Sequence, residues 1–179
     1  MNKKLIAVLL WVFSIIAVIH VTNQYTHIEE NLMAIAESTL DYIIEEEGYR
    51  NKAYKDTKGL WTIGVGHLIK SDEQHLLNAT LTDEQVKDLL KIDLKWCSEA
   101  VESSIGVSLP QPSMDALYSL CFNIGGPAFK KSTVVKRINA NDLKGAADAI
   151  EMWNKPAVLV SRRKREKALF LKGILGETI

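Results

Sequence analysis

Residues 46–67 of this 179-residue chain read EEGYRNKAYKDTKGLWTIGVGH, and this stretch decides the expected fold. Its centre, from Ala53 to Val65, carries aromatic and β-branched residues on both sides of the segment 56–59, DTKG. An aspartate that begins a four-residue turn and a glycine that ends it are typical of a β-hairpin. We therefore expect a small antiparallel sheet here.

The chain on both sides of this hairpin has the patterns of helices. Apolar residues recur at helical spacing from Ile28 to Glu47, and Gly48 is placed to end that helix. After the hairpin, Thr82 and Gln85 have the spacing of a capping box, which predicts the start of one long helix. The rest of the chain is expected to be helical, with caps at Ser113, Ser132 and Ser161, a turn into a helix at residues 141–142, and stops at Gly125 and Gly173. These elements predict an α+β fold that is mainly helical.

The first residues differ from the rest of the chain. Lys3 and Lys4 precede an apolar run from Leu5 to Val21 that contains no charged residue. About 17–25 apolar residues cross a bilayer as a helix, and the run lacks the polar face of a core helix. A cleaved signal peptide is the main alternative, but its apolar region is shorter and is followed by small residues at a cleavage site. We therefore expect an uncleaved signal anchor at residues 1–27, with its N-terminus in the cytoplasm and residues 28–179 exported as one domain.

The composition excludes several classes of function. The chain has 22 basic and 22 acidic residues, so no excess of positive charge points to nucleic-acid binding. The two cysteines, Cys97 and Cys121, are too few for a disulfide scaffold and have no neighbouring ligands at the spacing of a metal site. Both are expected to be buried, and a disulfide between them stays open as an alternative. We expect no cofactor, no metal and no nucleic-acid partner.

Two carboxyl groups in the deciding stretch form a candidate catalytic pair. Glu47 lies at the end of a helix whose apolar face packs into the protein, where burial would favour the protonated form. Asp56 lies at a solvent-facing turn, where it would stay ionised, and Thr62 on the return strand is placed to bind the same water as Asp56. Glycoside hydrolysis needs such a pair, one group to donate a proton and one to activate water. Taken alone, a glutamate before a glycine and an aspartate in a turn are also common structural residues.

The residues around this pair resemble the phage-type lysozymes of glycoside hydrolase family 24. That family has a Glu, eight residues, an Asp, five residues and a Thr, and Glu47, Asp56 and Thr62 match both spacings. The similarity continues through residues 61–67 (WTIGVGH), 117–125 (LYSLCFNIG) and the basic segment 161–166 (SRRKRE). It covers about residues 37–172, which is nearly the whole chain after the expected anchor.

The resemblance implies a lysozyme-like fold of two lobes, with the sheet in the N-terminal lobe and a glycan bound between the lobes. It implies hydrolysis, with inversion, of the β-1,4 bond between N-acetylmuramic acid and N-acetylglucosamine in peptidoglycan. Glu47 would be the general acid, and Asp56 and Thr62 would hold the attacking water. A histidine at the place of His67 pairs in such proteins with an acid on the following helix, and Asp93 is the candidate for a structural pair.

Other assignments stay open at this point. Arg50 is a candidate to contact Glu47 or the glycan, with an ordinary surface role as the alternative. For the basic cluster Arg162–Lys167, a solvated helix face is favoured over contact with the anionic cell wall.

The expected anchor resembles those of signal-anchor-release endolysins, which are held in the inner membrane of a Gram-negative host, facing the periplasm. Their anchors are usually rich in Gly, Ala and Ser, whereas this run is rich in Leu, Ile and Val.

We expect a monomer. The alternatives to a hydrolase are a lytic transglycosylase, which needs one Glu and no water-activating carboxylate, and a non-catalytic, membrane-tethered module that binds peptidoglycan.

Overall fold

The computed structural model describes residues 35–176, which belong to one unit built of helices and a small sheet. The expected anchor, residues 1–27, lies outside the described residues. Among the helices of residues 35–176, none combines the length and the apolar character needed to cross a membrane. In chain order, the elements are α2 (Glu37–Glu47), β1 (Arg50–Lys55), β2 (Trp61–Gly64), β3 (His67–Leu68), η1 (Gln74–Asn78), α3 (Asp83–Asp93), α4 (Lys95–Glu102), α5 (Gln111–Ile124), α6 (Gly126–Lys131), α7 (Thr133–Asn139), α8 (Leu143–Ile150), η2 (Ala157–Leu159) and α9 (Val160–Leu175).

Of the predicted helix Ile28–Glu47, residues 28–34 lie outside the described residues, and the described part is α2. Ala36 has an extended backbone, with φ −63° and ψ 146°, so α2 begins only at Glu37. The predicted end is confirmed. Gly48 has a φ of +70°, which glycine adopts without steric strain, and its N–H donates to the Ile44 carbonyl at 2.8 Å. Glu47 is therefore the last residue of the helix, directly before the chain turns into the sheet.

The hairpin predicted around residues 56–59 is confirmed. Strand β1 pairs antiparallel with β2, with Lys55 opposite Trp61 and Tyr54 opposite Thr62. A third strand, β3, which the sequence did not predict, pairs antiparallel with β2 and gives the order β1-β2-β3. The sheet packs on α3, and Ile63 at its centre is completely buried.

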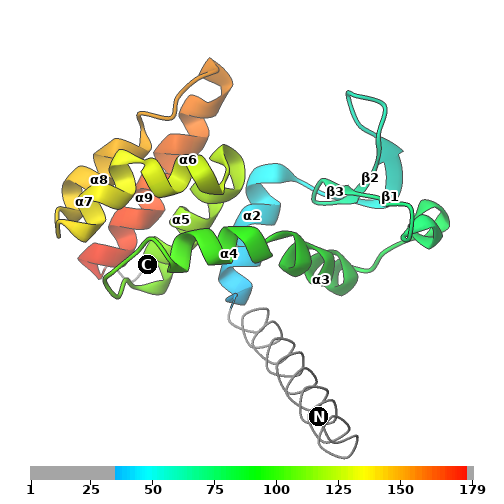
Figure 1. The fold of residues 1–179 in the computed structure, drawn as a ribbon, viewed down its shortest axis with the longest axis horizontal. Coiled ribbons are helices and arrows are strands. Elements are labelled where there is room, and N and C mark those ends of the chain that lie inside the picture. Colours follow the sequence, from blue (N-terminus) through cyan, green and yellow to red (C-terminus); the bar gives the residue numbers. More distant parts are fainter. Residues whose placement is uncertain (1–34, 177–179) are drawn as a thin grey trace, which may run out of the picture. The chain divides into compact units, whose positions relative to one another are not determined.

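The predicted capping box of α3 is also confirmed. The Thr82 hydroxyl accepts a hydrogen bond from the Gln85 N–H at 3.2 Å, and the Gln85 side chain accepts one from the Thr82 N–H at 2.9 Å. The single long helix predicted after it is wrong, because the chain forms α3 and α4 with a break at Leu94. The backbone of Leu94 has a ψ of −6°, whereas a regular helix has about −42°. Figure 1 shows α3 on the side of the sheet and α4 among the other helices.

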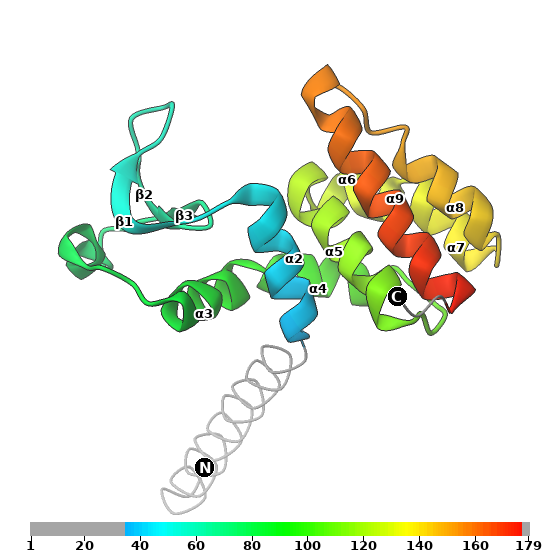
Figure 2. The ribbon, with the colours of Figure 1, turned by 180° about the vertical axis from the view of Figure 1, so that it is seen from behind.

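Helix α5 forms the centre of the helical part of the molecule. It packs against α2, α4, α6 and α9, and its residues 115–121 are all buried. Figure 2 shows α9 lying alongside α5, with α7 and α8 beyond α9. Cys97 of α4 and Cys121 of α5 are free, buried thiols, and Sγ of Cys97 donates to the Tyr118 carbonyl at 3.5 Å. The disulfide that the sequence left open is not formed.

Of the three remaining predicted helix caps, one is confirmed and two are wrong. Ser132 caps α7 by accepting the N–H of Val135. The predicted turn into a helix at residues 141–142 is confirmed, and there Asp142 caps α8 by accepting the N–H of Gly145. Ser113 lies inside α5, and its hydroxyl donates instead to a backbone carbonyl of α9 at 2.8 Å. Ser161 and Gly173 both lie inside α9, so neither begins or ends that helix.

Candidate active site

A salt bridge to α9 holds Glu47 at the end of α2. Its Oε1 accepts a hydrogen bond from Nη1 of Arg162 at 2.6 Å, although 115 residues separate the two in the sequence. The expected burial of the Glu47 carboxyl is not observed, because 30% of the side chain is exposed. The reason is its position, since the last residue before the Gly48 turn leaves the packed face of α2. A partly exposed carboxyl is accessible to a bound ligand.

A pocket of about 410 Å³ opens beside Glu47. Its wall continues from Gly48 through Arg50 to Tyr54 on β1 and includes residues 64–66 at the end of β2. The Arg50 guanidinium lies 4.4 Å from the centre of the Tyr54 ring, which is a cation–π contact. Within residues 35–176, Arg50 forms no salt bridge, so it lines the pocket while Arg162 is the partner of Glu47.

The side chains of Asp56 and Thr62 both form hydrogen bonds with the backbone of the same hairpin residue, Leu60. Oδ1 of Asp56 accepts hydrogen bonds from the N–H groups of Lys58 and Leu60, both at 2.8 Å. The Thr62 hydroxyl donates to the Leu60 carbonyl at 3.2 Å, and Thr62 is buried in the sheet. The two side chains therefore share Leu60 as a hydrogen-bond partner. Neither residue lines the pocket beside Glu47, and neither side chain bonds to the Glu47 carboxyl.

His67 is buried between two carboxylates. Its Nδ1 lies 2.9 Å from Oδ1 of Asp93 at the end of α3, and its Nε2 lies 3.1 Å from Oε2 of Glu73. The same oxygen of Glu73 accepts the N–H of Lys70 at 3.0 Å, and this bond, together with His67, holds the pKa of Glu73 below its usual value. Sequence reasoning missed Glu73, which lies in an irregular segment with no spacing rule. Across residues 35–176, no three His, Cys, Asp or Glu side chains are grouped as metal ligands would be.

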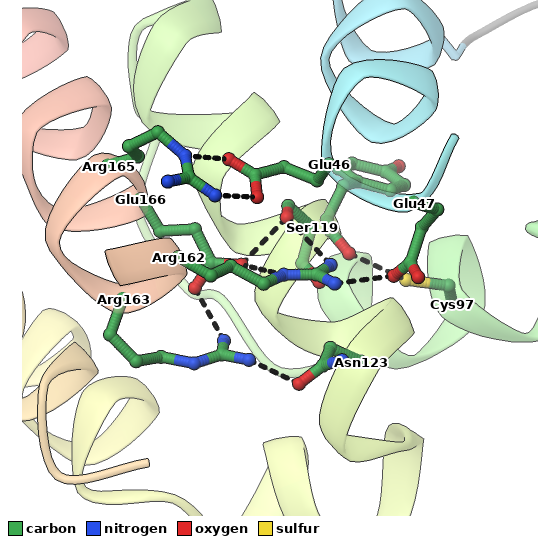
Figure 3. Close-up of polar contacts among 10 residues, drawn as sticks. Glu46, Glu47, Cys97, Ser119, Asn123, Arg162, Arg163, Arg165 and Glu166 are labelled. Atoms are coloured by element: carbon green, nitrogen blue, oxygen red, sulfur yellow. Dashed lines mark hydrogen bonds and ion pairs between the residues drawn. The ribbon is translucent and has the colours of Figure 1, made fainter. Parts of the chain in front are cut away.

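The basic cluster at the start of α9 is not a solvated face (Figure 3). Arg162 and Arg163 are buried, and both bind Glu166, which has no exposed surface. Nη2 of Arg162 also donates to the carbonyl and to the hydroxyl of Ser119 on α5, both at 3.1 Å. Asn123, one turn further along α5, accepts a hydrogen bond from Arg163. The predicted solvated face is wrong for these residues because α9 turns them toward α5.

Glu46, directly before Glu47, forms a second link between α2 and α9. Its two oxygens accept hydrogen bonds from Arg165 at 2.7 and 2.6 Å, and only 2% of its side chain is exposed. Burial raises the pKa of Glu46, but the hydrogen bonds and the charge of Arg165 outweigh burial and bring the pKa below its usual value. Two adjacent glutamates thus bind two arginines of the same helix.

Comparison with known proteins identifies the family of the chain. The family model described as phage lysozyme matches residues 44–166. The endolysin of Salmonella phage P22 is 44% identical over 145 residues, which cover 78% of this chain and 99% of that protein. The SAR-endolysin of Enterobacteria phage P21 is 34% identical over 132 residues, which cover 71% of this chain and 78% of that protein.

Solved structures agree with the sequence relatives. A crystal structure of a P22 lysozyme mutant has a TM-score of 0.72 at 44% identity, covering 76% of this chain and 97% of that one. The muramidase domain of SpmX from Asticaccaulis excentricus has a TM-score of 0.66 at 36% identity, with the same coverage. These findings confirm the expected lysozyme-like fold, mainly helical with a small antiparallel sheet. The chain belongs to the phage lysozyme family.

Proposed function

We propose that this chain is an endolysin, a muramidase that hydrolyses the β-1,4 bond between N-acetylmuramic acid and N-acetylglucosamine in peptidoglycan and so lyses a bacterial host. Membership in the phage lysozyme family and similarity to endolysins support this class of reaction. The observation that carries the proposal is the position of Glu47. Its carboxyl is partly exposed at the edge of a pocket and is paired with a buried arginine.

Glu47 is the general acid in this proposal. In its protonated form it donates a proton to the oxygen of the scissile bond, the bond from C1 to that oxygen breaks, and the departing sugar leaves as an alcohol. Glu47 is then a carboxylate. The guanidinium of Arg162, 2.6 Å from Oε1, stabilises the new negative charge without having to move.

Asp56 is the general base. Its Oδ1 is held by two N–H groups of its own turn, and Oδ2 has no hydrogen-bond partner among the described residues, which leaves that oxygen available to a water. Asp56 and Thr62 orient the water, which attacks C1 from the face opposite the leaving oxygen and gives its proton to Asp56. This geometry inverts C1. Inverting enzymes place the two carboxyl groups about 6.5–9.5 Å apart so that water fits between them, which agrees with the lack of direct contact between Glu47 and Asp56.

Three further residues have supporting roles in the proposal. Arg50, stacked on Tyr54 in the pocket wall, contacts the glycan. His67 and Asp93 form a structural pair, because their hydrogen bond fastens the end of the sheet to α3 and neither residue lines the pocket.

The proposal includes an anchor. Residues 1–27 hold the protein in the inner membrane of a Gram-negative host with the remaining residues in the periplasm. The uncharged run Leu5–Val21 and the similarity to SAR-endolysins support this placement. The enzyme acts as a monomer on the glycan strands and uses no cofactor.

The test is the chemistry of the ends that the full-length protein produces. The detergent-solubilised protein is incubated with purified peptidoglycan, and the products are identified by mass spectrometry. New reducing N-acetylmuramic acid ends support hydrolysis. Anhydro ends would show that the protein is a lytic transglycosylase. If the folded protein released no product, it would be a non-catalytic module that binds peptidoglycan.

Variants sharpen this experiment. Glu47→Gln should abolish cleavage, and Asp56→Asn should abolish hydrolysis but largely spare a transglycosylase. The matched control is Glu45→Gln, which removes an exposed carboxylate two residues before Glu47 on the same helix and should leave the rate unchanged. Full activity of Glu47→Gln would end the proposal.

A further inference from the structure

Glu166 is a buried carboxylate that the proposed reaction does not use. It has no exposed surface, and it lies on α9 facing α5. Oε1 accepts hydrogen bonds from the Ser119 hydroxyl at 2.7 Å and from Nε of Arg162 at 2.9 Å, and Oε2 accepts one from Arg163 at 2.5 Å. All three partners donate, so the geometry requires an acceptor at both oxygens. Burying a charge is costly unless it is paired in this way.

Arg162 connects this buried carboxylate to the candidate acid (Figure 3). Each nitrogen of its guanidinium has its own partner: Nε binds Glu166, Nη2 binds Ser119, and Nη1 binds Glu47. Glu166 and Ser119 together hold two sides of a planar group. The third side is therefore fixed in direction, and it points at the Glu47 carboxyl.

We propose that Glu166 is a positioning residue of the active site, which fixes Arg162 against Glu47 and keeps Arg162 paired while Glu47 changes its protonation state. This inference rests on the proposed function. Glu47 must be neutral before it donates its proton and charged afterwards. With Glu166 in place, Arg162 retains a carboxylate partner in both states. When Glu47 becomes charged, its partner is already oriented.

The charges around Glu166 come from two helices. From α9 it is faced by Arg162 and Arg163, with Arg165 one residue before it, and from α2 by the pair Glu46 and Glu47 and by Tyr42. From α5 it meets the neutral Ser119. Three arginines thus meet three glutamates. Removing one of these charges therefore leaves an unbalanced charge close to Glu47, which Arg162 binds directly.

The experiment compares two substitutions of opposite charge. Glu166→Gln keeps the shape of the side chain but leaves excess positive charge beside Glu47, so Glu47 loses its proton more readily. We expect kcat to fall about tenfold with KM within about twofold. The alkaline limb of the activity profile should move to lower pH. Arg163→Gln leaves excess negative charge, and the same limb should move to higher pH.

The measurements are initial rates of reducing-end release across pH and the 13C shift of the Glu47 carboxyl during an NMR titration, both on the full-length protein. Glu99→Gln, an exposed carboxylate on α4, is the matched control and should leave the profile unchanged. If Glu166→Gln does not fold, as judged by circular dichroism, the decision rests on Arg163→Gln, whose shift must still be to higher pH.

The outcomes separate this inference from the proposed function. An active wild type and an inactive Glu47→Gln variant establish the function independently of Glu166. Opposite shifts for Glu166→Gln and Arg163→Gln then support the positioning role. Unchanged pH–activity profiles in folded variants, or shifts of the same sign, would overturn the positioning role. A residue that is only structural changes the stability of the protein, and its replacement does not shift the pH profile in a direction that follows the charge removed.

Discussion

Gly173 of α9 packs directly against Ser113 of α5. A Cβ atom added there would lie 2.8 Å from the backbone nitrogen of Ser113 and 3.1 Å from the Cβ of Ser113. Ser113 cannot move aside freely, because its hydroxyl is hydrogen-bonded to the Phe170 carbonyl at 2.8 Å. The glycine in the middle of α9 is therefore required by close helix packing.

We predict that Gly173→Ala lowers the free energy of unfolding by about 1–3 kcal/mol, because α9 and α5 must separate to admit the methyl group. Urea denaturation followed by circular dichroism measures this. Adding Ser113→Ala should not restore stability, since the backbone nitrogen stays in place. Lys164→Ala, on the exposed face of α9, is the control. Full recovery in the double variant would contradict the backbone contact.

Among the helices, α3 depends on local sequence for its start. The reciprocal hydrogen bonds between Thr82 and Gln85 satisfy two backbone N–H groups that a helix end leaves free. Asp83 and Glu84 in the first turn add favourable charge at the positive end of the helix. Because the sheet packs on α3, this cap also fixes the position of the element that supports the hairpin.

We predict that Thr82→Ala costs about 1 kcal/mol of stability through loss of the cap, seen as a lower melting temperature by calorimetry. Thr82→Ser, which keeps the hydroxyl, should recover most of the loss. Ser108→Ala, in an exposed loop, serves as the control. An equal loss for the Ser and Ala variants would show that the methyl group, and not the hydroxyl, stabilises this helix end.

The sequence predicts correctly those features that are determined by residues close together in the chain. The hairpin at residues 56–59, the Gly48 stop and the Thr82 cap each depend on a few neighbouring residues, and all three are confirmed. The break at Leu94 was missed because its apolar neighbours have unbroken helical spacing. The sequence favours Gly173 as the end of a helix because glycine often ends helices. In the structure, the glycine is needed because α9 approaches residue 113, far away in the sequence.

The same limit applies to the site. The placement of Glu47, Asp56 and Thr62 in one short stretch suggests a site, the family spacing selects them, and the contact of His67 with Asp93 follows from the same resemblance. The partner of Glu47 was missed, since Arg162 lies 115 residues away and only tertiary packing brings it near. One signal was available: Arg162 and Glu166 are four residues apart, which suits an ion pair on one helix face.

For the molecule as a whole, α2 belongs with the helical part. The Thr39 hydroxyl donates to Asp115 of α5 at 2.5 Å in a buried contact, and Glu46 and Glu47 bind two arginines of α9. These contacts join the first described helix to the last. The stability of the whole unit is therefore expected to depend on pH through Glu46 of α2.

We predict that Glu46→Gln destabilises the protein by about 1 kcal/mol at pH 7, a modest value because Arg165 is 55% exposed and water screens the pair. The pKa of Glu46 is lowered in the folded state, so its contribution is present above the ordinary value of 4.5 and is lost as pH falls through the lowered folded value. Urea midpoints of variant and wild type should therefore differ at pH 7 and converge as the pH falls below the lowered pKa of Glu46. A difference that persists in acid would contradict the charge explanation.

The two helices α3 and α4 meet at Leu94, and α2 meets the sheet at Gly48. The proposed acid is fastened to α5 and α9, while the proposed base is carried by a hairpin that packs on α3. The distance between the proposed proton donor, Glu47, and the proposed base, Asp56, therefore depends on the backbone angles at Leu94 and at Gly48.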